Sequence, residues 1–148
     1  GVSDYDYIDL DPCGSPFVSI PQSIRLIEDG YLSITYGDIQ LKRWGRHNPL
    51  MKAYRMPETE DFRTTAEYMV GWTMFEGVRQ EKAAETRKLT VVDVKAMPSL
   101  NKGVMRVLFK VEKTRSLNPV LQELKEKMED TEEDGPLNGR YPLGEYLD

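Results

Sequence analysis

The fold of this protein is decided by the stretch YDYIDLDPCGSP, residues 5–16. Its first half is rich in strand-forming side chains, and two prolines and a glycine then end the strand in a turn. Residues 17–28 place apolar side chains at helical spacing, with Pro21 in the first turn, where proline is tolerated. A second strand is expected at 31–36. Strand, helix and strand in this order predict a βαβ unit with two parallel strands and a right-handed crossover.

The rest of the chain predicts a mixed α/β fold. Apolar periodicity and turn residues separate the remaining segments. The expected elements are a long functional loop at 37–58 with at most a short helix at 50–54, a long helix capped by Thr59 and reaching near Thr86, an antiparallel hairpin of strands 89–96 and 104–112, and a last helix at 119–128 capped by Asn118.

Composition excludes several classes of protein. The chain has 148 residues, of which 39% are hydrophobic and 30% charged, as expected for one globular domain. A single cysteine, Cys13, and a single histidine, His47, exclude an intrachain disulfide framework and zinc or paired-histidine metal sites. No run approaches the roughly 20 apolar residues of a membrane span, and no basic and apolar leader precedes the acidic start. A cytoplasmic location is the expectation.

The net charge of −5 conceals a strong segregation of charge along the chain. Residues 1–41 hold seven acids and one base, and residues 116–148 hold nine acids and three bases. By contrast, the segment 42–55 contains no acid and five bases, which are Lys42, Arg43, Arg46, Lys52 and Arg55. Such a cluster suits a polyanionic partner, and a solvated loop is the competing interpretation. The acidic end of the chain is expected to be a mobile tail.

The turn after the first strand carries a specific family resemblance. Residues 8–16, IDLDPCGSP, resemble the motif Ile-Asp-Ile/Leu-Asp-Pro-Phe/Tyr-Gly-Ser-Pro of the tRNA (guanine-26-N2) dimethyltransferases, the Trm1 family of S-adenosylmethionine-dependent enzymes. The strand 30–38, the helix 59–78 and the hairpin ending at 105–111 are also similar to segments of that family. The resemblance covers about residues 4–113.

This resemblance implies a partial Rossmann-like class I methyltransferase sheet. The family's sheet has seven strands, and this chain contains candidates only for strands four to seven, with a terminal antiparallel hairpin. The first half of the domain, with its glycine-rich cofactor turn and ribose-binding acid, is lacking. Residues 1–115 are therefore expected to form the C-terminal half of a methyltransferase-like domain, followed by a helix and acidic tail at 116–148. We expect a second polypeptide, or a second copy of the chain, to cover the edge of the strand Tyr5–Leu10.

The chemistry of the motif supports catalysis by Asp11. The lone pair of a purine's exocyclic amine is drawn into the ring, so the amine is a poor nucleophile until its protons are accepted by hydrogen-bond acceptors. The Asp11 carboxylate and the Pro12 carbonyl can accept both protons, and Gly14 lets a flat base approach the backbone. The competing interpretation is that Asp11 only caps the following helix.

The predicted site residues follow from the motif and its resemblance. Asp11 and Pro12 are the expected catalytic residues and the only cofactor-binding residues in the chain. The cofactor is S-adenosylmethionine, with no metal, and tRNA or another RNA is the expected partner. The expected substrate-binding residues are Cys13, Gly14, Ser15, Pro16, Thr35, Asp38, Arg43 and Arg46.

One position departs from the family motif. Cys13 stands where the family has an aromatic ring placed to stack on the target base, and a thiol offers no comparable stacking area. Three functions therefore remain open at this point. They are guanine-N2 methylation in tRNA, adenine-N6 methylation of a nucleic acid, and a non-catalytic methyltransferase-like subunit for assembly or RNA binding.

Overall fold

The computed structural model describes residues 5–80, 86–128 and 139–147 of the chain. Four strands form one mixed sheet in the order β1-β2-β4-β3. They are β1 (Tyr7–Leu10), β2 (Asp29–Tyr36), β3 (Arg87–Met97) and β4 (Val104–Lys113). β1 and β2 are parallel, and β4 pairs antiparallel with both β2 and β3. The predicted parallel pair and terminal hairpin are both confirmed.

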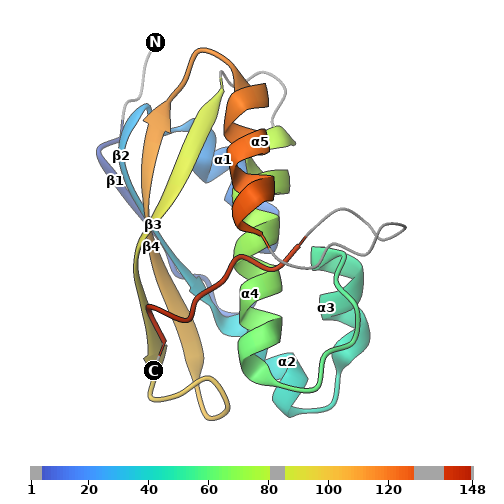
Figure 1. Cartoon of the computed structure of the whole chain (residues 1–148). Helices are drawn as coiled ribbons and strands as arrows, with labels where there is room; N and C mark the ends of the chain where they lie inside the picture. Colours follow the sequence, from blue (N-terminus) through green and yellow to red (C-terminus); the bar gives the residue numbers. More distant parts are fainter. Residues whose placement is uncertain (1–4, 81–85, 129–138, 148) are drawn as a thin grey trace.

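The helices pack in one layer against one face of this sheet (Figure 1). In chain order they are η1 (Phe17–Ser19), α1 (Ile20–Arg25), η2 (Gly37–Ile39), α2 (Gln40–Arg43), α3 (His47–Tyr54), α4 (Phe62–Trp72), the π-helical turn η3 (Thr73–Gly77) and α5 (Leu117–Lys127). α4 lies along the sheet, and α2 and α3 lie together beside one end of α4. None of the helices in the described part of the chain is both long and apolar enough to cross a membrane.

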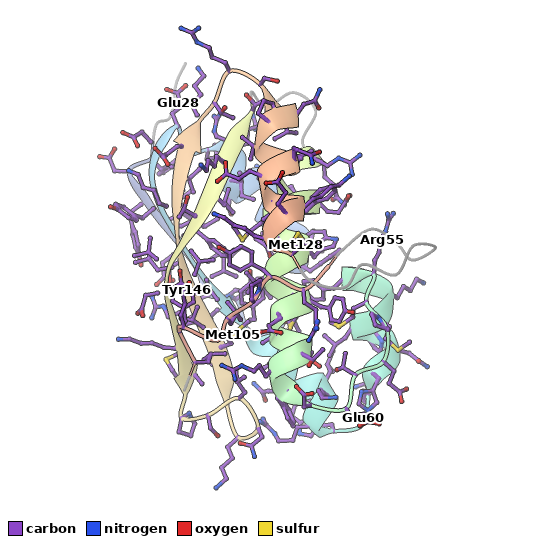
Figure 2. The ribbon with its side chains drawn as sticks, in the orientation of Figure 1. Glu28, Arg55, Glu60, Met105, Met128 and Tyr146 are labelled. Carbon is purple, nitrogen blue, oxygen red and sulfur yellow. The ribbon has the colours of Figure 1, made fainter. Side chains whose placement is uncertain are left out.

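The core lies between the sheet and the helices. Alternate residues of each strand point to this side, because successive side chains of a strand face opposite ways. On β2 and β4 these residues are fully buried: Leu32, Ile34, Tyr36, Met105, Val107, Phe109 and Val111. Side chains from α1 and α4 fill the space opposite them, and Figure 2 shows Met105 within this layer.

No described helix packs on the opposite face of the sheet (Figure 1). Tyr7 and Tyr31 are 51% and 41% exposed on this side. Two ion pairs link strands across the same face. Arg106 on β4 reaches across β2 to Asp9 on β1, with Nη2 3.0 Å from Oδ2, and Lys110 Nζ on β4 lies 2.9 Å from Asp29 Oδ1 on the neighbouring β2. Asp9 on the edge strand is therefore paired with an arginine of β4.

Several predicted element boundaries are wrong. The N-cap of α4 is Asp61, whose Oδ1 accepts a 2.7 Å hydrogen bond from the Thr64 N–H, and not Thr59. Thr59 instead bonds the Thr65 hydroxyl with its own hydroxyl and accepts the Lys42 ammonium at its carbonyl. The segment 37–58 is not a long loop, since it holds η2, α2 and α3. α5 begins two residues earlier than predicted, with Ser116 at its N-cap position.

The last described segment, residues 139–147, packs on the core. Leu143 is fully buried, and its N–H donates a 3.0 Å hydrogen bond to Glu67 Oε2 on α4. The Tyr141 N–H donates to the Glu67 carbonyl at 3.1 Å. This segment and α5 are thus part of the packed structure, and the helix predicted before the acidic tail is present. The acidic run 129–134 lies outside the described residues.

Candidate active site at the carboxyl edge of the sheet

The predicted catalytic turn leaves the carboxyl end of β1. Because β1 and β2 are parallel, the segments that follow them leave from the same edge of the sheet, the position where α/β folds bind their ligands. Asp11 and Cys13 are exposed and Pro12 is half-buried. Gly14 has φ +113°, a conformation that favours glycine, and a Cβ there would meet nothing within 4 Å. The turn therefore presents an open backbone and one carboxylate to the surroundings.

Asp11 does not cap the helix that follows it. The N-cap positions of η1 and α1 are Pro16 and Ser19, and neither cap has a side-chain hydrogen bond. Asp11 makes no hydrogen bond or ion pair with any residue that the structure describes. The competing interpretation from the sequence is thereby excluded, and both carboxylate oxygens are available to a ligand.

The second predicted acid, Asp38, lies beneath the turn. Its Oδ2 accepts two hydrogen bonds, one from the Ser15 hydroxyl at 2.8 Å and one from the Tyr54 hydroxyl at 2.6 Å. The residue is only 5% exposed, and burial raises the pKa of the carboxyl, while the bonds from Tyr54 and Ser15 oppose that rise. Its other oxygen, Oδ1, is buried and has no hydrogen-bond partner among the described residues.

The other predicted pocket residues divide into surface and buried positions. Ser15 is exposed, whereas Pro16 is buried. Thr35 is 6% exposed, and its hydroxyl oxygen finds no partner in the described part of the chain. The structure thus brings Ser15 and Asp38 into direct contact, and Asp38 and Thr35 are both buried.

Three aromatic rings support the turn from below. Phe17 packs on Tyr54 and Trp72 with ring centroids 5.1 and 4.4 Å away, and the Tyr54 and Trp72 centroids are 5.6 Å apart. At Gly37, just before Asp38, a Cβ would lie 2.8 Å from the Gly14 carbonyl oxygen. This close approach requires a glycine and holds the turn against the end of β2.

The basic cluster 42–55 is not one continuous surface. Lys42 is 7% exposed, with its ammonium bonded to the Thr59 carbonyl. Arg43 is half-buried, and its Nη1 donates to the Gly103 carbonyl in the β3–β4 turn at 3.4 Å. Arg46 is exposed, and so are Lys52 and Arg55; Figure 2 shows Arg55 projecting from the side of α3 away from the sheet. Of the two arginines predicted to bind RNA, only Arg46 is fully exposed.

Trp44 is a candidate that the sequence interpretation missed. It ends α2 and is 61% exposed, unlike the other tryptophan, Trp72, which is 1% exposed. Large aromatic side chains are seldom left this open, and single-stranded nucleic acids stack their bases on such rings. The available signal was its position between Arg43 and Arg46 in a segment without acids.

The described residues fit only one end of S-adenosylmethionine. Two parallel strands reach the carboxyl edge: β1 leads into the Asp11 turn, and β2 leads directly into η2. Neither strand is followed by a glycine-rich turn that could hold the cofactor's adenosine. Asp11 and Pro12 suit the reacting end, where an amine meets the methyl donor.

Comparison with known proteins identifies the fold. No protein-family model and no curated protein matches the sequence. Among solved structures, Trm1 from Pyrococcus horikoshii in complex with S-adenosyl-L-methionine matches with a TM-score of 0.64 at 16% identity. The match covers 93% of this chain and 36% of that one, so this chain spans about a third of the neighbour's length. The chain therefore has a methyltransferase-like fold that corresponds to one part of a larger protein.

Proposed function

We propose that this chain provides the catalytic turn of an S-adenosylmethionine-dependent nucleobase N-methyltransferase, and that its target is guanine N2 in tRNA. The observation that carries this proposal is Asp11. It is an exposed carboxylate without a partner in the described structure, and it lies at the carboxyl edge of a methyltransferase-like sheet, in the turn that resembles the guanine-N2 enzymes.

The chemistry needs an acceptor for the amine protons and an open approach for a flat base. The Asp11 carboxylate accepts a hydrogen bond from the amine, and the Pro12 carbonyl accepts the second, so that the amine lone pair is directed away from the ring plane. The open backbone at Gly14 leaves room for the base above the turn. S-adenosylmethionine supplies, when bound, an electrophilic methyl group on a positively charged sulfur.

The RNA contacts of this proposal lie on the segment that follows β2. Arg46 is exposed and makes the proposed contact to a phosphate. Arg43, which is bonded to the β3–β4 turn, assists that contact. Trp44, between them, is open enough to stack on an unpaired base. Since this segment leaves the same edge of the sheet as the Asp11 turn, an RNA bound there is positioned next to the proposed catalytic group.

The partner in this proposal completes the sheet next to β1. β1 is an edge strand that pairs only with β2 among the described strands. Tyr7, its first residue, and Tyr5, just before it, are about half exposed. A strand from another polypeptide, from a second copy, or from a longer version of the same chain would pair with this edge. The same added segment would bring the glycine-rich turn and the acid that the cofactor requires.

A methyl-transfer assay tests the proposal. The chain, alone and with any co-purifying partner, is mixed with methyl-labelled S-adenosylmethionine and unmodified tRNA. The Asp11→Asn variant is expected to lose activity by roughly a hundredfold or more, because general-base and electrostatic terms are each of that order. Asp9→Asn is the matched control, since Asp9 is an exposed acid on the preceding strand that pairs with Arg106. No methyl transfer in any combination, or full transfer by Asp11→Asn, would contradict the proposal.

The target base is decided by substrates that differ in one amine. Inosine is guanosine without its 2-amino group, so tRNA with inosine at the methylated position is expected to accept no label. Transfer to adenine-containing RNA or DNA instead of guanine would identify an adenine-N6 enzyme.

Cys13 favours a second candidate, a non-catalytic subunit. It is exposed in the turn, at the position where the resembling family has a stacking aromatic ring. A chain that does not bind cofactor even with its partner, and that tolerates Asp11→Asn without any loss of function, would support this candidate.

A further inference from the structure

We propose that Asp38 is a positioning residue that couples the RNA-facing segment α2–α3 to the catalytic turn. This inference rests on the proposed function of the turn. One carboxylate oxygen, Oδ2, accepts hydrogen bonds from both sides: the Ser15 hydroxyl of the turn at 2.8 Å and the Tyr54 hydroxyl of α3 at 2.6 Å. The two donors come from segments 39 positions apart in the sequence, and Asp38 is the group that they share.

On the side of the turn, the Ser15 hydroxyl makes two hydrogen bonds. Its hydroxyl donates to Asp38, and the same oxygen accepts a 3.2 Å hydrogen bond from the Phe17 N–H. Ser15 directly follows Gly14, whose backbone lies against Gly37. The position of Ser15 therefore fixes the end of the turn that Asp11 begins.

On the side of α3, Tyr54 transmits the position of the helix. Tyr54 is the last residue of α3 and is fully buried, with its ring packed edge-on against Phe17 and Trp72. The same helix begins at His47, directly after Arg46. An RNA bound to Trp44 or Arg46 thus contacts the segment that leads into α3, and the last residue of α3 is bonded to Asp38.

The burial of Asp38 argues against direct contact with a substrate. The residue is 5% exposed, and its Oδ2 already has two donors. Burying a carboxyl group is costly, and here Oδ1 is left without a partner in the described structure. An arrangement that costs stability suggests a functional reason for keeping it, and tying two functional segments together is such a reason.

The single cysteine of the chain offers a direct measurement of this coupling. Cys13 is exposed in the middle of the turn, so a nitroxide spin label attached to it reports the mobility of the turn by electron paramagnetic resonance. Tyr54→Phe removes one hydroxyl from the junction and is expected to increase the mobility of the label severalfold. Ser15→Ala is expected to do the same, and the double variant should exceed neither single variant by much, because both break one pathway.

Tyr36→Phe is the matched control. Tyr36 is also a fully buried tyrosine near Asp38, and its hydroxyl also makes one short side-chain hydrogen bond, but this bond goes to Thr73 Oγ1 at 2.7 Å and not to Asp38. Its label spectrum should equal that of the wild type. If Tyr36→Phe and Tyr54→Phe increased the mobility of the label equally, the cause would be a general loss of packing, and the proposal would be overturned.

Addition of RNA distinguishes coupling from simple support of the turn. A single-stranded RNA oligonucleotide is expected to restrict the label in the wild type and in Tyr36→Phe, but not in Tyr54→Phe. Equal restriction in all three proteins would overturn the coupling. In the complex that transfers methyl groups, Tyr54→Phe should lower kcat by roughly ten- to a hundredfold and leave KM for RNA nearly unchanged. A change in KM alone would contradict a positioning role.

Asp38→Asn completes the series, because an amide oxygen accepts the same two hydrogen bonds without charge. It should preserve the label spectrum and most of the methyl transfer, whereas Asp38→Ala should resemble Tyr54→Phe. Loss of activity in Asp38→Asn with an unchanged label spectrum would make Asp38 a catalytic group and overturn the proposal. The label measurements need no cofactor, so they remain decisive even if no methyl transfer is found and the proposed function fails.

Discussion

At the scale of single residues, Gly14 is a position where backbone conformation alone dictates the side chain. Its φ of +113° disfavours any L side chain, although a Cβ would have open space. We expect Gly14→Ala to lower the free energy of unfolding by about 1–3 kcal/mol, the usual cost of such strained backbone. Gly45, with φ +71° and equally open surroundings, is the control, and its alanine variant should cost less. Urea denaturation measures both, and equal costs would show that the turn changes conformation.

The buried carboxyl of Asp38 predicts a dependence of stability on pH. Its pKa is raised by burial, so the folded state holds the proton more tightly than the unfolded state. Its contribution is therefore complete below the ordinary aspartate pKa of about 3.9 and is lost as pH rises through the raised value. The groups facing it, Tyr36 and Tyr54, have raised pKa values as well and stay neutral in this range.

The Asp38→Asn variant isolates this contribution. The difference in free energy of unfolding between wild type and variant should move in favour of the variant as pH rises from about 4 toward neutrality. Chemical denaturation across this range measures it, with Asp9→Asn as an exposed control. A difference that is constant with pH would mean that the folded state does not raise the pKa of Asp38.

At the scale of elements, the end of α1 depends on a side chain from the other half of the chain. Arg87, at the start of β3, is 4% exposed, and its Nε and Nη2 donate to the carbonyls of Ile27 and Arg25 at 2.7 and 3.0 Å. The last carbonyls of a helix have no partner within the helix, and they carry the negative end of its dipole. The Arg87 guanidinium donates hydrogen bonds to these carbonyls and places a positive charge at the negative end of the dipole.

We expect Arg87→Met to be strongly destabilising. It leaves carbonyl oxygens buried without their charged donor, at a cost of about 1.5–3 kcal/mol per bond of this kind. Lys88→Met, at the next position, is the control, because Lys88 forms only a 3.8 Å surface ion pair with Glu123 and should matter little. Thermal and urea denaturation compare the two, and similar effects would contradict a capping role for Arg87.

The same scale shows what could be predicted from the sequence. The strands were predictable because they are short runs of strand-forming residues bounded by turn residues, with buried and partly exposed side chains alternating along β4. The Asp11 turn was predictable from its prolines and glycine. α2 was not predicted, and of α3 only the part at 50–54 was expected, because both helices are short and depend on contacts such as that of Tyr54 with Asp38, 16 positions away. The N-cap at Asp61 was misplaced to Thr59 because both residue types cap helices, and only the tertiary contacts of Thr59 decide between them. The hydrogen bonds from Ser15 and Tyr54 to Asp38 could not be predicted either, because they also depend on the tertiary structure.

At the scale of the whole molecule, one helical layer packs on a four-stranded sheet, and α2 and the proposed catalytic turn both follow the carboxyl ends of the two parallel strands (Figure 1). If RNA binds there, Trp44 should report it, since its ring is exposed while Trp72 is buried. We expect a single-stranded RNA oligonucleotide to quench the tryptophan fluorescence of the wild type, and Trp44→Phe to abolish the quenching. Quenching that persists in Trp44→Phe would place the RNA elsewhere.

The basic cluster leads to a last prediction, because two of its cations, Lys42 and Arg46, have opposite surroundings. Arg46 is exposed, whereas Lys42 is 7% exposed, donates to the Thr59 carbonyl and lies 5.7 Å from the centre of the Phe62 ring. Only an exposed cation can displace counterions from a phosphate backbone. Arg46→Gln should therefore weaken RNA binding and reduce the slope of log affinity against log salt by about 0.7, the value for one contact to a single strand. Lys42→Gln should leave that slope unchanged and instead lower the free energy of unfolding, because the partly buried Thr59 carbonyl loses its charged donor. Binding measured by fluorescence anisotropy at several salt concentrations separates the two, and an equal loss of slope in both variants would mean that Lys42 leaves its buried position to meet RNA.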